Sequence, residues 1–63
     1  MRLNRTKIQL LMAKRLISQA ALADNAGVSR QSMSAVMNGR NCRPELLGKI
    51  AKALEVEPEE IIE

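Results

Sequence analysis

The chain has 63 residues, so it forms a single domain spanning residues 1–63. A domain of this size buries only about 60% of the surface that its unfolded chain exposes, which leaves no room for a catalytic cleft between domains. It has no histidine and one cysteine, Cys42, which excludes a zinc site of the usual Cys/His type and any disulfide within one chain.

The net charge of +3 is unevenly distributed along the chain. Residues 1–43 hold eight basic side chains and one acid, Asp24, whereas residues 44–63 hold two lysines and six glutamates. A basic face joined to an acidic rear is typical of proteins that bind a polyanion.

Hydrophobic residues make up 46% of the chain and none is aromatic, so the core must consist of Leu, Ile, Val, Met and Ala. Most of these are good helix formers, and few residues favour strands. We therefore expect an all-α fold, a compact five-helix bundle. No stretch approaches the roughly 18 apolar residues of a membrane span, and the first residues lack the apolar run of a signal peptide. With a single cysteine, a cytoplasmic location is expected.

The first helix is predicted over residues 5–15, with Asn4 as its N-cap. Three apolar residues recur at the i, i+3, i+4 spacing of one helical face: Ile8, Leu11 and Met12. Leu16 is expected to pack just beyond the end of this helix.

Two short helices are predicted next, over residues 19–26 and 30–38, each preceded by a serine that suits an N-cap. Gly27 lies between them, where a chain that leaves a helix usually needs a positive φ. Helices joined by so tight a turn must cross steeply, and Ala23 supplies the small side chain that such a crossing needs. The buried stripe of the second of these helices is expected to be Met33, Val36 and Met37.

A loop follows, in which Asn38 and Gly39 end the preceding helix with a left-handed turn. Cys42 is interpreted as a bystander on this loop. Pro44 suits the first position of a fourth helix. That helix has the clearest amphipathic stripe in the chain: Leu47, Ile50, Ala51 and Leu54.

A last short helix is predicted to start at Pro58 and to end in Ile61 and Ile62. Two isoleucines on a terminal turn are more than a small core obviously needs. They either close the bundle or form a dimer seam, and the sequence favours neither alternative.

The stretch from Gln19 to Asn38 resembles the helix-turn-helix of phage repressor and Cro-like regulators, often called the XRE family. The family's small, glycine and apolar positions are occupied here by Gln19, Ala23, Gly27, Met33 and Val36. The family's common Asn-Gly-basic ending is present at residues 38–40, and residues 50–54 look like its fourth helix. The resemblance covers residues 8–62 without an obvious gap.

In this motif the first turn of the second helix faces base edges in the major groove of DNA. The side chains on that side are Arg30, Gln31, Ser34 and Ala35. Arginine can donate two hydrogen bonds to guanine and glutamine can pair bidentately with adenine, whereas Ala35 offers only a methyl group. Taken alone, Arg30 and Gln31 would be interpreted as part of a solvated helix face; the surrounding motif favours base contact.

Contacts to the DNA backbone are expected at both ends of the motif. The resemblance implies that Gln19, at the start of a helix, holds a phosphate, and helix N-termini do bind anions. The loop offers the other phosphate-binding candidates: Asn38, Arg40 and Arg43. The family often has a basic residue where Met12 stands and uses it to contact the DNA backbone, and Met12 carries no charge for that contact. The family usually has a glycine where Glu55 stands, so the helix that ends there must end in a different way.

An enzyme is excluded by the residues present, because there is no histidine and no nucleophile with a base beside it. No Gly-rich phosphate loop is present, and no cofactor, metal, small-molecule ligand or membrane partner is expected. We expect a Cro-like or prophage-type repressor that occupies double-stranded operator DNA.

A monomer that reads a few base pairs would discriminate poorly among genomic sites. A weak homodimer on a palindromic operator is therefore expected. Its interface is predicted to be formed by Leu54, Val56, Ile61 and Ile62. An antitoxin and a restriction-system control protein would share the fold. A protein-interaction module is the remaining alternative, because a fold does not fix a function. That alternative would gain if the arginines paired with glutamates of the acidic tail.

Overall fold

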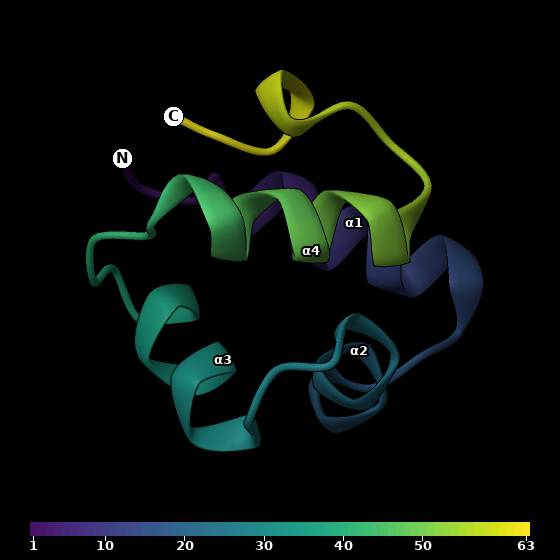
Figure 1. Cartoon of the computed structure of the whole chain (residues 1–63). Coiled ribbons are helices and arrows are strands. Elements are labelled where there is room, and N and C mark those ends of the chain that lie inside the picture. Colours follow the sequence, from purple (N-terminus) through teal and green to yellow (C-terminus); the bar gives the residue numbers. More distant parts are fainter.

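Four α-helices follow one another in the computed structural model, which describes residues 1–63, and a single 3-10 turn comes after them (Figure 1). The elements are α1 (Arg5–Arg15), α2 (Gln19–Ala26), α3 (Arg30–Met37), α4 (Pro44–Leu54) and η1 (Pro58–Glu60). The predicted all-α class is confirmed. The predicted fifth helix is wrong, because η1 spans only three residues and ends before Ile61. No helix combines the length and the apolar character that a membrane span requires.

The starts of the first three helices are fixed by side-chain caps. In each, a side-chain oxygen accepts the backbone N–H three positions on: Asn4 from Lys7, Ser18 from Ala21, and Ser29 from Ser32. These bonds satisfy N–H groups that have no partner inside the helix. The fourth helix instead begins with proline, which has no N–H to satisfy.

The helices are arranged around α4, which contacts α2 on one side and η1 on another (Figure 1). In the view of Figure 1, α2 and α3 lie below the α1–α4 pair, and the two termini lie together above it. The amphipathic stripe of α4 is fully buried, as predicted, and so are Met33, Val36 and Met37 of α3. Ala23 is completely buried where α2 contacts α3, which agrees with the small side chain expected there.

The two ends of the chain pair with each other. Leu3 and Ile62 form an isolated antiparallel bridge, and the Asn4 N–H donates to the Ile61 carbonyl at 2.7 Å. The Glu63 N–H donates to the Arg2 carbonyl at 3.0 Å. Between these bonds the Ile61 side chain is completely buried. Of the two alternatives left open by the sequence, Ile61 therefore closes the bundle.

This burial revises the predicted dimer interface. Leu54 and Ile61 have no exposed surface within one chain, so their side chains cannot contact a second copy of the chain. They were assigned to a seam because apolar periodicity does not distinguish a core contact from an interface contact. Val56 and Ile62 are half-buried and pack against the core with part of their surface still exposed.

Three helices end in the same way, although only one of them ends in glycine. Leu16, Gly27 and Glu55 follow α1, α2 and α4 with φ angles of 54°, 71° and 57°. After each, the next N–H donates to a carbonyl five residues back, as in the bond from Ile17 to Met12 at 3.2 Å. The left-handed turn points Leu16 outward, so it is 92% exposed and Ile17 packs in its place. The expectation that Leu16 packs was wrong.

Candidate nucleic-acid interface

The α2–α3 pair is held at a fixed geometry by its turn and its core contacts. The Gly27 N–H donates to Asp24 O at 3.2 Å, and the Val28 N–H donates to Ala23 O at 3.0 Å. Ser29 then caps α3 directly. With only two residues between the last turn of α2 and this cap, the outer face of α3 has a fixed orientation relative to α2.

The outer face of α3 carries the four residues predicted to read bases. Arg30 and Gln31 are exposed in the first turn, and Ser34 and Ala35 are half-buried one turn further on. Residues at i, i+1, i+4 and i+5 share one side of a helix, opposite the buried stripe. The structure therefore brings all four together on a single face.

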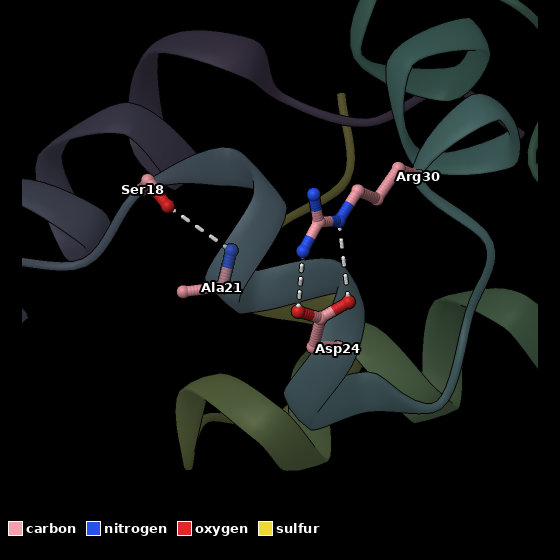
Figure 2. Close-up of polar contacts among 4 residues, drawn as sticks. All are labelled: Ser18, Ala21, Asp24 and Arg30. Carbon is pink, nitrogen blue, oxygen red and sulfur yellow. Dashed lines mark hydrogen bonds and ion pairs between the residues drawn. The ribbon is translucent and has the colours of Figure 1, made fainter.

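Arg30 is not free on this face, because Asp24 of α2 holds its guanidinium (Figure 2). Arg30 Nη2 donates to Asp24 Oδ2 at 2.9 Å, and Arg30 Nε lies 3.4 Å from Asp24 Oδ1. The hydrogen bond from Arg30 holds the pKa of the Asp24 carboxyl below its ordinary value, and the same bond raises the pKa of Arg30. Both groups stay ionised at neutral pH.

Asp24 was not among the residues predicted for this site. One signal was present, since Asp24 is the single acid among residues 1–43. Periodicity within one helix does not reveal the pair, because the contact crosses the turn between two helices.

The loop after α3 holds the second group of predicted residues. Arg40 and Arg43 are exposed and make no ion pair. Both line a shallow hollow on the surface beside α3, together with Ala35 and Asn41. The backbone N–H groups of Asn41 and Arg43 donate to no acceptor within the chain. Two cations and two free donors thus lie next to the outer face of α3.

This loop is anchored by Cys42, which is completely buried and belongs to the core. The Cys42 N–H donates to the Met1 carbonyl at 2.6 Å, and the Cys42 thiol lies 3.6 Å from the Arg43 carbonyl. Nothing in the sequence pattern indicated this burial, and Cys42 was interpreted only as a bystander on the loop. Burial raises the pKa of its thiol, which keeps it protonated and unreactive at neutral pH.

The remaining predicted phosphate contacts lie at the ends of the pair. Gln19 is the first residue of α2 and is half-buried, and the N–H groups of Gln19 and Ala20 donate to no protein acceptor. Asn38 is exposed at the end of α3, with its Nδ2 3.5 Å from Ser34 Oγ. Gly39 follows with a φ of 101°, so the predicted left-handed turn is confirmed.

The glutamates of the acidic tail form no ion pair with the arginines on α3 or in the loop after it. Glu55 pairs with Arg15 at 3.3 Å, and Glu45 lies 3.8 Å from Lys49. No glutamate pairs with Arg30, Arg40 or Arg43, so the condition that would favour a protein-interaction module is not met. No cluster of three potential metal ligands is present.

The sequence model of the Cro/C1-type HTH DNA-binding domain matches residues 7–63. The chain belongs to this family. The α2–α3 pair is thus the helix-turn-helix of a Cro/C1-type domain, and the resemblance noted in the sequence is confirmed. This membership establishes DNA binding as the general function of the chain.

Solved structures of two proteins are similar to this Cro/C1-type domain. The restriction-modification controller protein C.AhdI from Aeromonas hydrophila is 32% identical, with a TM-score of 0.79 over 89% of this chain and 86% of that chain. PhpD, in a structure with cadmium atoms, is 27% identical with a TM-score of 0.82 over 100% of this chain. The chain spans only 14% of the length of PhpD. No curated protein matches the chain.

Proposed function

We propose that the chain is a cytoplasmic, non-enzymatic regulator that binds specific double-stranded DNA with α3 in the major groove and represses transcription by occupying an operator. The observation that carries this proposal is the outer face of α3, where Arg30 and Gln31 are exposed beside two unpaired arginines of the next loop. Arginine and glutamine match the major-groove edges of guanine and adenine, and free cations beside them match the flanking phosphates.

The phosphate contacts would come from the two ends of the helix-turn-helix. Gln19 and the free N–H groups at the start of α2 suit one phosphate, because helix N-termini attract anions. Asn38, Arg40 and Arg43 suit phosphates on the other side of α3. Contacts of this kind fix the orientation of a protein on DNA without carrying sequence information.

A homodimer on half-sites one helical turn apart would supply the discrimination that one small domain lacks. The surface left for it near the C-terminus is limited, since only Val56 and Ile62 of the predicted seam remain partly exposed. We therefore propose a weak dimer that forms fully on DNA.

Selection of bound sequences from random duplex DNA tests the function and the dimer together. We expect a palindromic site whose two halves are centred about one helical turn apart. A single unrepeated half-site would contradict the dimer, and the absence of any enriched sequence at moderate salt would contradict specific DNA binding.

The similarity to C.AhdI favours a second candidate within DNA binding, a control protein of a restriction-modification system. The likeness covers most of both chains, whereas the PhpD likeness covers a small part of PhpD. A footprint over the promoter of this chain's own gene, with methyltransferase and endonuclease genes beside it, would support this candidate. A different gene neighbourhood would leave the prophage-type repressor as the function.

A further inference from the structure

The way in which Asp24 holds Arg30 leaves half of the guanidinium available. A guanidinium has one bidentate edge formed by Nε and Nη2 and a second formed by Nη1 and Nη2. Asp24 occupies the first edge, with its two oxygens 3.4 Å from Nε and 2.9 Å from Nη2. In Figure 2 the remaining nitrogen, Nη1, points away from the carboxylate. The second edge is the one that can still bond guanine O6 and N7 end-on.

Helix stability does not explain why an acid stands at position 24. Asp24 lies toward the C-terminal end of α2, where the helix dipole disfavours a negative charge. It is exposed on a surface otherwise rich in cations, next to the helix proposed to enter DNA, so phosphates repel it. An exposed ion pair also contributes little to folding. Folding therefore gives this carboxylate little reason to be there, and its contact with Arg30 is the remaining observation.

The carboxylate changes what Arg30 attracts. A free guanidinium binds phosphate strongly because both carry a full charge. The ion pair of Arg30 and Asp24 has no net charge, and a phosphate that approaches the guanidinium also meets the carboxylate. Base acceptors carry no net charge, so they avoid this repulsion and can still accept from the open edge.

We propose that Asp24 is a positioning residue that presents Arg30 to a guanine and keeps it from binding phosphate. The proposal rests on the proposed entry of α3 into the major groove. It adds a residue of α2 to the specificity determinants and predicts guanine, rather than any other base, opposite Arg30.

The test is Asp24→Asn, which keeps the shape of the side chain and removes its charge. Selection of bound sequences by the wild-type protein first identifies the guanine whose enrichment Arg30→Ala abolishes. For Asp24→Asn we expect the preference for that guanine to fall by about tenfold, which corresponds to roughly 1.4 kcal/mol. Binding to unrelated duplex should tighten, and the salt slope should rise by about one phosphate contact, because Arg30 is released to the backbone.

The matched control is Glu59→Gln, which makes the same change in net charge on the exposed 3-10 turn η1, with no hydrogen bond or ion pair to lose. We expect it to leave both the guanine preference and the salt slope unchanged. Thermal unfolding of Asp24→Asn should match that of the wild-type protein, which separates positioning from a structural role. In an Arg30→Ala background, Asp24→Asn should no longer change the base preference.

Two results would overturn the inference in different ways. If Asp24→Asn bound its site with an unchanged guanine preference, the positioning role would be wrong while the proposed function stood. If the wild-type protein enriched no sequence at all, the proposed function would fail and this inference with it.

Discussion

The helix-turn-helix and the rest of the domain differ in how their surfaces are used. The α1 and α4 helices have 11 residues each, and each carries one cation that pairs with a glutamate: Arg15 of α1 with Glu55, which follows α4, and Lys49 of α4 with Glu45. The α2 and α3 helices have eight residues each and stand beside cations that pair with no glutamate. Helices of eight residues are unstable alone, so this half depends on the core supplied by α4.

This difference teaches that stability and recognition are assigned to separate groups of side chains. The buried stripe of α3 belongs to the core and the outer face is exposed or half-buried, with no residue shared between them. Substitutions in the scaffold should therefore change unfolding without changing base preference, and substitutions on the outer face should do the reverse. The four predictions below test that separation.

The largest effect is expected at the end of the chain, at Ile61. Ile61→Ala should lower the free energy of unfolding by about 2–5 kcal/mol, because it leaves a cavity at a completely buried position. Urea denaturation measures this loss. If the alanine variant does not fold, Ile61→Val tests the same contact, with an expected loss of about 0.5–1.5 kcal/mol. Ile62→Ala is the control and should lose less, since Ile62 is half-buried. An altered base preference in the valine variant would break the separation.

On the outer face of α3, Gln31→Ala should weaken binding to the best site by about 1–3 kcal/mol and flatten the preference for adenine. Its unfolding should not change, because the Gln31 side chain is exposed and makes no hydrogen bond. Competition binding with single-base variants of the selected site is the measurement. An unchanged preference for both Gln31→Ala and Arg30→Ala would remove the base-reading assignment.

The residues with positive φ at the helix ends allow two predictions, in which the free energy of unfolding changes in opposite directions. Leu16→Gly should raise the free energy of unfolding by about 1 kcal/mol, because Leu16 is strained at φ 54° and 92% exposed. Gly27→Ala should lower it by about the same amount, since the φ of 71° suits glycine and no atom obstructs an added methyl group. Thermal unfolding of both variants against wild type tests this. If both substitutions changed the free energy of unfolding in the same direction, the proposed strain at Leu16 would be wrong.

The smallest effect is expected in the loop. Arg40→Ala should weaken binding to all duplexes alike and lower the salt slope by about one phosphate contact. Titrations at several salt concentrations, on the selected site and on unrelated DNA, provide the slope. A loss confined to one sequence would show that Arg40 reads a base, and an unchanged slope would place Arg40 away from the backbone.

The sequence was sufficient for the parts of the fold that depend on local signals. Asn4, Ser18 and Ser29 cap the helices where they were predicted to, and Pro44 begins α4. These features involve residues a few positions apart, which a sequence displays directly. The same holds for the face of α3, because helical periodicity alone separates its two sides.

Two features that the sequence did not reveal depend on contacts between distant segments. Cys42 is buried because the N-terminal residues cover the loop, and Ile61 is buried because it returns to Leu3 and Asn4. The exposure of Leu16 follows from a left-handed turn made without the glycine that usually marks it. In the site, the missed residue was Asp24, whose contact with Arg30 crosses a turn.

The pairing of the two chain ends has a practical consequence for engineering. The C-terminus lies on the side of the bundle away from α2 and α3, so a fluorescent protein fused there should leave the recognition face clear (Figure 1). The N-terminal amino group instead donates to Asn41 in the loop after α3, so a fusion at that end would stand beside the proposed phosphate contacts. Ends held together by backbone hydrogen bonds also suit circular permutation, in which a short linker joins them and the chain is reopened elsewhere. The exposed Leu16 between α1 and α2 is a suitable place for the new opening.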